Sequence, residues 1–367
     1  MNCQRVLIVN AGSSSLKLQL LDGDDRVVEQ HTVERWTGEG SDAPLRDFLD
    51  SAGTVDAVGH RVVHGGPRYS NAVRIDDAVV DYLASIVDLA PLHQPKAVEG
   101  IRTLNALLPG VPAVACFDTA FHATMPAAAS TYALPAEWNE RWQLRRYGFH
   151  GLSHAYAVRR GAALADVPLE TLRVVSCHLG AGASLAAVRH GRSVDTTMGF
   201  TPLEGLVMVT RSGSVDPGLL LWLLREGTLG VEELSQGLEK RSGLAGLSGT
   251  TGDLRDVLAA RTDGDETAAL AYDVFLHRLC RDIAAMTAAA GGLDLLVMTG
   301  GIGERSAVIR GDTAERLAYL GVAVDATRNA AASADADISA DEAGVRTVVV
   351  TAREDLEIAR LVRSVLE

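Results

Sequence analysis

The sequence lacks the features that would mark a secreted or membrane protein. Its four cysteines are dispersed and include no CxxC pair, which argues against a disulfide framework and against a zinc site. No stretch approaches the roughly 18 consecutive apolar residues of a membrane span. The four apolar residues before Asn10 are too few for the apolar core of a signal peptide. We therefore expect a cytoplasmic protein.

Positive charge is also scarce. The chain has only three lysines (Lys17, Lys96 and Lys240) and a formal net charge of −13. Nucleic acids and anionic membranes would be repelled, so neither is expected as a partner. An acidic chain that binds a nucleotide must concentrate its cations locally, so arginines close to glycines are candidate anion ligands. With 367 residues and 47% hydrophobic content, the chain is long enough for two domains with real cores.

A short apolar run followed by a small polar turn opens the chain. Residues 6–9 (VLIV) predict a strand buried on both faces, and the turn NAGSSS follows it. Gly12 would let the backbone N–H groups converge on an anion, and Lys17 would add a positive charge. An ordinary β-turn between two strands is the alternative interpretation.

The same construction recurs twice. Residues 174–185 again run from a strand into a glycine turn, and His178-x-Gly180 repeats Asn10-x-Gly12 at an offset of 168 residues. A third strand and glycine turn occupies residues 295–304. No Gly-Lys dipeptide occurs, so none of these is a Walker P-loop, and none completes a dinucleotide fingerprint. The matched turns predict a duplicated α/β domain that closes on a nucleotide.

Strand-like and helix-like patterns alternate along the chain, which favours α/β layers. The patterns predict helices over residues 77–90, 267–290 and 353–367, strands over 113–117 and 347–350, and a solvated surface excursion over 325–344. The long apolar helix over 267–290 is a candidate dimer face.

Four further clusters have a chemical character, and each has a structural alternative. Arg61, in GHRVVHGG, could neutralise a small anion or form a structural salt bridge. Asp118, in FDTAFH, stands where α/β sites gather, but it could cap the next helix. His150 lies between glycines in YGFHG, although a lone histidine is commonly structural. Arg211 lies in a turn rich in backbone donors and could be a solvated loop cation.

These strings, together with GFTPLEG, follow one another over nearly the whole chain in the order of the acetate kinase (acetokinase) family, which the sequence closely resembles. The segments that carry the resemblance are Val6 to Lys17, Gly59 to Gly66, Phe117 to Met125, Arg146 to Gly151, Cys177 to Ser184, Met198 to Glu204, Arg211 to Pro217 and Gly301 to Glu304.

The resemblance implies the duplicated ribonuclease-H-like fold of actin, sugar kinases and heat-shock chaperone ATPases, with two α/β domains flanking a nucleotide cleft. It implies an acetate- and phosphate-side domain over residues 1–149 with the terminal helix 355–367. Residues 150–354 would then form a nucleotide-binding and dimerisation domain. The implied reaction is reversible, Mg²⁺-dependent transfer of the ATP γ-phosphate to acetate, giving acetyl phosphate and ADP. Mn²⁺ could replace Mg²⁺, and the protein would be a homodimer.

The resemblance also assigns roles to individual residues. Asn10 and Glu354 would hold the metal, Lys17 would contact the ATP phosphates, and His150 would donate a hydrogen bond to the phosphoryl group in transfer. Arg61 and Arg211 would bracket the acetate carboxylate and that same group. The methyl pocket would be formed by Val63, Leu92, Phe149 and Pro202. The nucleotide would be held by His178, Leu179, Gly180, Ala181, Gly182, Asp253, Leu254, Arg255, Gly301, Ile302, Gly303, Glu304 and Arg305.

Two of these residues have alternative roles. Asp118 is the family's usual candidate for proton chemistry, but a carboxylic acid of pKa about 4 is already ionised at neutral pH and needs no base. Asp118 is better interpreted as orienting Arg61 or metal-bound water. Glu354 lies in the pattern Thr351-Ala-Arg-Glu, which could be a capping box that needs no metal.

Departures from the family pattern concern the nucleotide side. Ala181 stands where the family usually has Asn, and Arg305 where Asn is common. Leu152 replaces a frequent Thr, and the segment from Leu21 to Asp56 is short for the family. These changes predict an altered nucleotide affinity. A propionate or butyrate kinase remains the alternative within the class, and a non-metabolic actin-like ATPase remains the alternative outside it.

Overall fold

The chain divides into two compact units in the computed structural model, which describes residues 4–11, 15–34, 36, 42–91, 93–225 and 227–367. Unit 1 consists of Met1–Ala123, Phe149–Tyr156 and Arg353–Glu367, and unit 2 consists of Thr124–Gly148 and Ala157–Ala352. Each unit contains one six-stranded sheet. No described helix is long and apolar enough to cross a bilayer.

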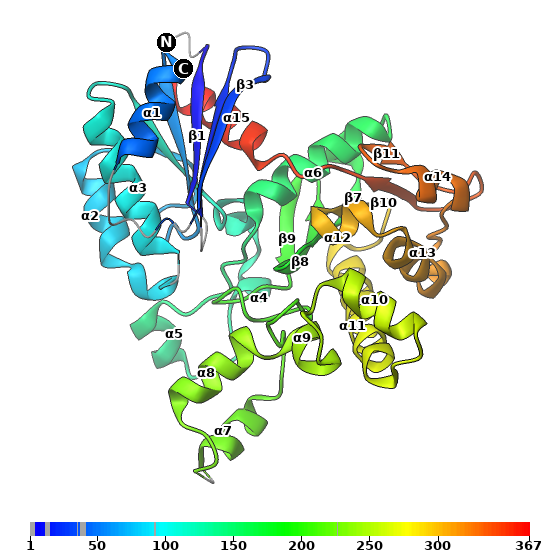
Figure 1. The fold of residues 1–367 in the computed structure, drawn as a ribbon. Helices are drawn as coiled ribbons and strands as arrows, with labels where there is room; N and C mark the ends of the chain where they lie inside the picture. The colour runs from blue at the N-terminus through cyan, green and yellow to red at the C-terminus, as the bar shows by residue number, and fades with distance from the viewer. Residues whose placement is uncertain (1–3, 12–14, 35, 37–41, 92, 226) are drawn as a thin grey trace. The chain divides into compact units, whose positions relative to one another are not determined.

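The sheet of unit 1 has the strand order β3-β2-β1-β4-β6-β5, of which Figure 1 labels β1 and β3. Its strands are β1 (Val6–Ala11), β2 (Ser15–Leu21), β3 (Val27–Glu34), β4 (Ala57–Val62), β5 (Val73–Arg74) and β6 (Ala113–Phe117). β1, β2 and β3 form an antiparallel meander, whereas β1, β4 and β6 are parallel. The predicted strands over 6–9 and 113–117 are therefore confirmed, and both are buried as their apolar composition requires.

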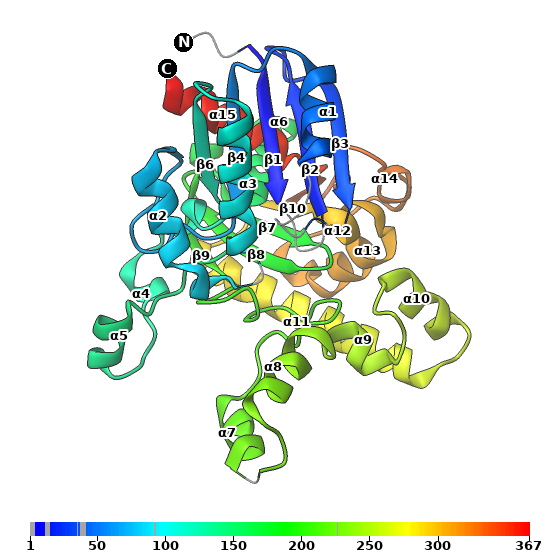
Figure 2. The ribbon, with the colours of Figure 1, turned by 60° about the vertical axis from the view of Figure 1, so that its left-hand side comes forward.

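Helices pack on the two faces of this sheet. The helices of unit 1 are α1 (Ala43–Ala52), α2 (Asp77–Ser85), α3 (Gln94–Leu107) and α15 (Glu354–Leu366), with 3₁₀ turns η1 (Val87–Leu89) and η2 (Ala120–Thr124). Leu45, Phe48 and Leu104 of α1 and α3 share one core cluster with Leu7 and Val58. α15 packs against the other face of the sheet (Figure 2). It approaches so closely that a Cβ on Gly59 would lie 2.5 Å from the Ile358 Cγ2 atom.

The sheet of unit 2 repeats this topology with the order β11-β12-β10-β7-β8-β9. Its strands are β7 (Arg173–Leu179), β8 (Ala183–Arg189), β9 (Arg192–Thr196), β10 (Leu295–Thr299), β11 (Ala336–Asp337) and β12 (Arg346–Val349). β7, β8 and β9 form the antiparallel meander, β7, β10 and β12 are parallel, and β11 is the antiparallel edge strand. Strand for strand this matches unit 1, so the predicted duplication of an α/β domain is confirmed.

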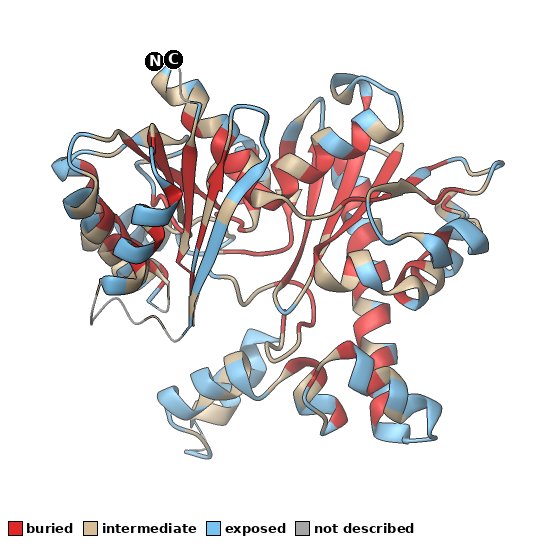
Figure 3. Cartoon of the chain, turned by 45° about the horizontal axis from the view of Figure 1, so that its top comes forward, coloured by how far each residue is buried: buried red, intermediate tan, exposed pale blue. Residues whose placement is uncertain are grey.

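The remaining helices are α4 (Ala127–Ser130), α5 (Ala136–Trp142), α6 (Gly151–Leu164), α7 (Pro217–Arg225), α8 (Val231–Lys240), α9 (Gly243–Ser248), α10 (Leu254–Thr262), α11 (Glu266–Ala290), α12 (Gly300–Arg305), α13 (Ala307–Arg316) and α14 (Ala326–Ala331), with 3₁₀ turns η3 (Leu169–Thr171) and η4 (Ala318–Leu320). α6 begins in unit 1 and ends in unit 2. The strands are mostly buried, whereas α7 and α8 bury no residue (Figure 3).

One prediction about a surface segment needs correction. Residues 325–344 are not simply a solvated excursion, because they contain α14 and β11, and Ile338 and Ser339 are buried. α11 spans the predicted long helix, and most of its apolar residues are buried where it packs against β7, β8 and β9, although Leu270 is 59% exposed. Whether α11 contributes to a dimer face stays a prediction.

Candidate functional site

Three parallel strands of unit 1 end at one edge of the sheet, and the polar side chains at these ends meet there. Register pairs Asn10 of β1 with Arg61 of β4, and Asp118 follows directly after β6. Parallel strands present their carboxyl ends at the same edge, which is where ligands bind in open α/β sheets. The start of α15 adds Glu354 to the same group.

Arg61 is the centre of this group. Its Nη2 and Nε atoms donate to the Asp118 carboxylate at 2.8 and 3.2 Å, and its Nη1 atom donates to Asn10 Oδ1 at 3.2 Å. Glu354 Oε2 lies 3.5 Å from Arg61 Nη1. The structure thus brings together Asn10, Arg61, Asp118 and Glu354, and Arg61 does form the salt bridge that was the alternative to an anion-binding role.

Burial and neighbouring charges change the pKa values of Arg61 and Asp118. Burial acts to lower the pKa of the Arg61 guanidinium, but the negative charges of Asp118 and Glu354 outweigh it and raise that pKa. Arg61 therefore stays protonated. Burial raises the pKa of the Asp118 carboxyl above its usual range, and Arg61 opposes that shift. The bidentate contact with Arg61 supports the interpretation of Asp118 as a residue that orients Arg61.

Glu354 begins α15, but not as part of a capping box. The residue before the helix is Arg353, and no side chain caps the helix N-terminus. The expected capping pattern at Thr351 is therefore not formed, since the Thr351 N–H donates instead to Asp335. The carboxylate of Glu354 faces Arg61 rather than the helix backbone.

His150 sits on a strained segment just before α6. Its φ of 56° lies in the left-handed region, which side-chain-bearing residues rarely adopt and which often marks a functional position. Gly151 N donates to the Asp118 main-chain carbonyl at 2.8 Å, and a Cβ on Gly151 would lie 2.2 Å from that oxygen. Only glycine allows this approach, which holds His150 beside the end of β6.

The remaining predicted site residues of unit 1 that the structure describes form no hydrogen bond or ion pair with Arg61. Lys17 is exposed on β2 directly opposite Asn10, so it flanks the first glycine turn. Gly12 to Ser14 and Leu92 lie outside the described residues. Val63 and Phe149 are buried, and the Phe149 ring contacts the His64 ring at a centroid distance of 5.7 Å.

Two glycine turns lie side by side in unit 2. β7 and β10 are parallel with His178 opposite Thr299, so the turns that follow them leave the same edge of the sheet. Gly300 has a φ of 77°, and a Cβ there would lie 2.7 Å from the Leu179 carbonyl oxygen. The segments 178–182 and 301–305 are therefore adjacent. Leu179 is buried, so only its backbone can face a ligand.

Residues 253–255, the third segment that the resemblance assigns to the nucleotide, lie at the start of α10. The Asp253 side chain caps this helix by accepting from Arg255 N, and it also pairs with the exposed Arg255 guanidinium. These hydrogen bonds from Arg255 hold the pKa of Asp253 at about 2, and the positive charge of Arg305 contributes to the same shift. Arg305 is thus close to this segment, whereas Leu254 is buried.

Arg310 is a residue of this region that the sequence analysis missed. Only 1% of it is exposed, and its guanidinium donates to the main-chain carbonyls of Gly303 and Glu304 and to Asn329. It therefore anchors the end of the 301–305 turn. A clue in the sequence was its position one helical turn after that motif, but nothing there distinguishes a buried arginine from a surface one.

Arg211 differs from Arg61 in having neutral partners. Its Nη1 atom donates to the Pro202 carbonyl at 3.2 Å and lies 3.7 Å from Met208 Sδ. No carboxylate among the described residues forms an ion pair with it. Burial lowers the pKa of Arg211 from its ordinary value, and the negative charge of Glu239, which forms no ion pair with it, opposes that shift only in part.

The oxygen atoms near Arg61 determine which kind of metal ion this part of unit 1 could hold. The described residues contain no cluster of three histidine, cysteine or acidic side chains that could enclose an ion. The available oxygens are the Asn10 amide and the carboxylates of Asp118 and Glu354. Such a set suits a hard divalent ion that keeps several waters and is held partly by substrate phosphates. The residues therefore fit Mg²⁺ better than a metal that requires a closed protein cage.

Comparison with known proteins identifies the family. A family model described as the acetokinase family matches residues 42–360. The chain belongs to the acetokinase family. An acetate kinase from a Synechococcus strain is 49% identical over 332 residues, which is 90% of this chain and 80% of the relative.

Solved acetokinase-family structures have the same fold. The acetate kinase of Porphyromonas gingivalis superimposes with a TM-score of 0.92 at 35% identity, covering 99% of this chain and 100% of its own. A propionate kinase from Francisella tularensis reaches a TM-score of 0.91 at 35% identity, covering 98% and 99%. The expected two-domain actin-like ATPase fold is therefore confirmed, and the chain is a member of a family of kinases whose chemistry uses ATP or ADP and a divalent metal.

Buried histidines in unit 1 of this acetokinase-family chain predict acid sensitivity. His122 Nε2 donates to the Phe149 carbonyl at 3.0 Å, next to His150. Burial lowers the pKa of His122 and of His64 to about 4, and that of His60 to about 3. The folded state keeps these groups neutral, whereas the unfolded chain binds protons below about pH 6.5. Stability should therefore be full above that pH and fall as the pH drops toward 4, by roughly 1.4 kcal/mol per pH unit for each histidine.

Trp36 is the only tryptophan of unit 1, so its fluorescence, with the other three tryptophans changed to phenylalanine, can follow the unfolding of this unit. Urea titrations between pH 7.5 and 5 should show the loss of stability, and His122→Gln should reduce its slope by about one proton. A free energy of unfolding that does not change over this range would contradict the prediction.

Proposed function

We propose that the chain catalyses reversible transfer of the γ-phosphate of ATP to acetate, giving acetyl phosphate and ADP, with Mg²⁺ or Mn²⁺ as the metal. The observation that carries the proposal is the state of Arg211, a half-buried cation with only neutral acceptors. A desolvated guanidinium without a carboxylate partner attracts a planar anion, and its fork matches both a carboxylate and a phosphoryl group. Family membership supports the same assignment.

Unit 1 would supply the acetate and metal side of the reaction. Asn10 and Glu354 would hold Mg²⁺, and Asp118 would keep Arg61 in place through its two hydrogen bonds. When bound, the metal would offset the negative charge of the phosphates. Lys17 would add a positive charge at the first glycine turn.

Unit 2 would bind the nucleotide. The turns 178–182 and 301–305 offer backbone N–H groups, and Asp253, Leu254 and Arg255 would complete this site. Because Ala181 has no polar side chain, more of the contact with the phosphates falls to backbone donors. Arg310 would keep the second turn in its shape.

The acid would be held by apolar side chains and by both arginines. Val63, Leu92, Phe149 and Pro202 would form the methyl pocket, and the Arg61 and Arg211 guanidinium groups would face the carboxylate and the transferring phosphoryl group. Acetate is already ionised at neutral pH, so the reaction requires no base. Phosphoryl transfer depends mainly on position and charge stabilisation, and His150 would contribute a hydrogen bond to the group in transfer.

A propionate or butyrate kinase is the second candidate, because a propionate kinase shares the fold as closely as an acetate kinase does. One methylene in an apolar pocket changes selectivity by about 10- to 200-fold. The preference among short acids is therefore a question of pocket volume.

Hydroxylamine trapping of acyl phosphate tests the proposal directly. The protein with ATP and Mg²⁺ should give a strong signal with acetate and a decreasing signal with propionate and butyrate. A signal that is largest with a longer acid would keep the mechanism and identify the second candidate. A folded, ATP-binding protein that forms no acyl phosphate from any of the three would contradict the proposal and favour the actin-like ATPase.

Replacing Arg211 tests its role separately. Arg211→Ala removes one charge-assisted contact to the transition state and should reduce kcat by about 10²–10³-fold, equivalent to roughly 2.7–4 kcal/mol. Its melting temperature should stay near that of the parent, since no ion pair is broken. Arg192→Ala, which removes an exposed arginine of β9, is the matched control and should keep full activity. Near-normal turnover by folded Arg211→Ala would exclude Arg211 from the mechanism.

The setting of the protein completes the proposal. We propose a cytoplasmic enzyme, because the described cysteines (Cys116, Cys177 and Cys280) are free and buried, as in a reducing compartment.

We also propose a homodimer. α7 is rich in leucine, yet Leu221 and Trp222 remain 51% and 57% exposed. Apolar side chains gathered on one exposed helix favour a partner surface, and a second copy would cover them.

A charge on α7 should therefore separate the dimer. Trp222→Glu should shift the mass measured by light scattering at micromolar concentration from that of two chains to that of one. Tyr319→Glu, which changes another exposed aromatic residue of unit 2, should leave the parent mass unchanged. If the parent itself is monomeric, the dimer proposal fails. If Trp222→Glu remains dimeric, α7 is not the interface.

A further inference from the structure

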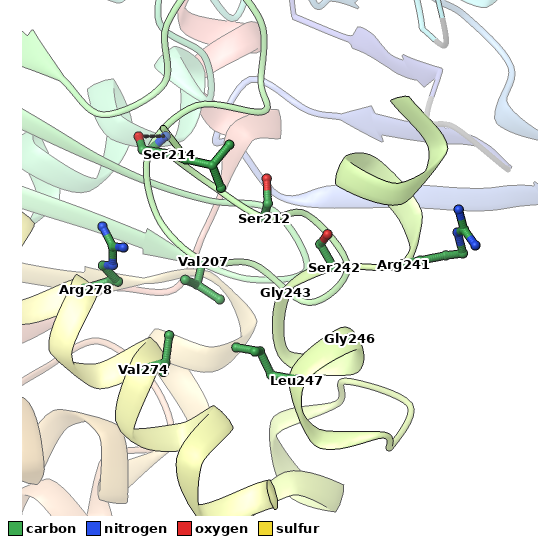
Figure 4. A pocket seen from close by; sticks show the side chains of 12 residues that line it. Val207, Ser212, Ser214, Arg241, Ser242, Gly243, Gly246, Leu247, Val274 and Arg278 are labelled. Carbon is green, nitrogen blue, oxygen red and sulfur yellow. Dashed lines mark hydrogen bonds between the residues drawn. The ribbon is translucent and has the colours of Figure 1, made fainter. Parts of the chain in front are cut away.

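The loop that carries Arg211 has open space beneath it. A pocket of about 300 Å³ lies between this loop, the start of α9 and the middle of α11 (Figure 4). Val207 and Ser212 line it from the loop, Leu247 from α9, and Val274 and Arg278 from α11. Close packing is what normally fixes a buried segment. Because open space lies on this side of the loop, its position depends on contacts elsewhere. Some are direct backbone hydrogen bonds, such as those from Leu244 N and Ala245 N to the Met208 and Val209 carbonyls, both at 2.9 Å.

The carboxylate of Glu204 supplies further contacts just before the loop. Arg146 Nη2 donates to Glu204 Oε1 at 2.6 Å, and the Tyr132 hydroxyl donates to Glu204 Oε2 at 2.8 Å. The other arm of Arg146 donates to the main-chain carbonyls of residues 196–198. Both carboxylate oxygens are therefore held, and the same arginine ties Glu204 to the end of β9.

The Glu204 head group also lies against the backbone of its own turn. A Cβ on Gly199 would lie 1.7 Å from Glu204 Oε2, so only glycine leaves room for the carboxylate. The Phe200 N–H donates to the Tyr132 hydroxyl at 2.8 Å, and the Gly199 carbonyl accepts from the N–H of Tyr147. Residues 199–204 thus form a closed turn. We call the Glu204 carboxylate, with its partners Arg146 and Tyr132, the clasp of this turn.

This turn holds Arg211. The Pro202 carbonyl, at the middle of the turn, accepts from Arg211 Nη1 at 3.2 Å. At the end of the turn, Gly205 N donates to Ser214 Oγ at 3.0 Å, and Ser214 N donates to the Gly205 carbonyl at 2.9 Å. The turn therefore contacts both the Arg211 guanidinium and the far end of its loop.

We infer that Glu204 is a positioning residue that sets the place of Pro202 and Arg211 for the acid substrate. Glu204 acts through these two residues and not on the reacting atoms. Its effect on catalysis rests on the proposed function, whereas its effect on the loop does not. A displacement of about 1 Å in a group that orients a substrate can reduce the rate by roughly 10²-fold.

Two variants test the kinetic consequence. Glu204→Gln removes the charge that Arg146 requires, and Tyr132→Phe removes one hydroxyl from the clasp. Glu204→Gln should raise the KM for acetate and lower kcat, reducing kcat/KM for acetate by about tenfold to a hundredfold. The KM for ATP should change less than the KM for acetate, because no hydrogen bond joins Glu204 to the nucleotide turns among the described residues. The loop does reach Ala181 through a long hydrogen bond from Val209 N to its carbonyl at 3.3 Å. Tyr132→Phe should show the same pattern with a smaller loss.

Asp294→Asn is the matched control. It breaks another arginine–carboxylate pair of unit 2, between Asp294 and Arg173, at the starts of β10 and β7. This control should lower the melting temperature about as much as Glu204→Gln without changing the KM for acetate. Equal changes in the KM values for acetate and ATP in Glu204→Gln, or the same kinetics in Asp294→Asn, would overturn the inference.

Hydrogen–deuterium exchange separates this inference from the proposed function. Peptides covering residues 199–214 should exchange faster in Glu204→Gln than in the parent, and should not do so in Asp294→Asn. Unchanged exchange there overturns the inference even if the kinetics change. If the parent forms no acyl phosphate, the proposed function fails, while the exchange still decides whether Glu204 holds the loop. Faster exchange with unchanged acetate kinetics would also overturn the positioning role.

Discussion

The polar group of unit 1 and the paired glycine turns of unit 2 both depend on the register between parallel strands. In unit 1, β1, β4 and β6 run in the same direction, so Asn10, Arg61 and Asp118 reach the same edge of the sheet. In unit 2, β7 and β10 have the same relation, which places the two glycine turns next to each other. A slip of one residue would turn every side chain to the opposite face. Because both faces of these strands are apolar, the close packing of the core, such as that of Ile358 against Gly59, is what opposes a slip and fixes the polar groups at its edge.

Three arginines show how local partners divide one residue type among different tasks. Arg61 is neutralised by Asp118 and Glu354, so its position is set tightly and its charge is shared. Arg310 is buried among carbonyls and an amide, where its fork holds the shape of a turn. Arg211 has a single oxygen acceptor among the described residues, the Pro202 carbonyl. Burial and partner charge together, and neither alone, indicate which arginine is structural and which is available to a ligand.

Much of the fold was predictable because it follows from local pattern. The strands over 6–9 and 113–117 are short apolar runs that end at polar residues, and the helix over 267–290 has apolar residues at helical spacing. The matched turns at Asn10 and His178 predicted the duplication, because the two sheets repeat the same connection between strand and glycine turn. Residues 325–344 were misinterpreted because their composition is that of a solvated loop. Ile338 nevertheless becomes buried through its neighbours in space, which composition does not report.

The residues of the candidate site were predictable only where they belong to a recognisable sequence motif. The side chains of Arg61 and Asp118 stand in recognisable strings, but the bidentate contact between them joins residues 57 positions apart. The role of Arg310 depends on burial, and the clasp at Glu204 joins three separate segments of unit 2. Pairwise contacts of this kind are fixed by tertiary packing, so a single sequence contains no local signal for them. The capping-box interpretation of Glu354 failed for the same reason, since Arg61 lies near it only in the folded chain.

The scarcity of lysine has a physical counterpart in the proposed chemistry. Burial lowers the pKa of a cation, and a lysine ammonium in an apolar site can lose its proton near neutral pH. The guanidinium of Arg211 also has a pKa lowered by burial, yet it starts so high that it remains charged. A half-buried arginine can therefore stay desolvated and free of a carboxylate partner without becoming neutral. In a chain with a net charge of −13, this allows positive charge to be kept at any physiological pH inside a loop that we propose to bind an anion.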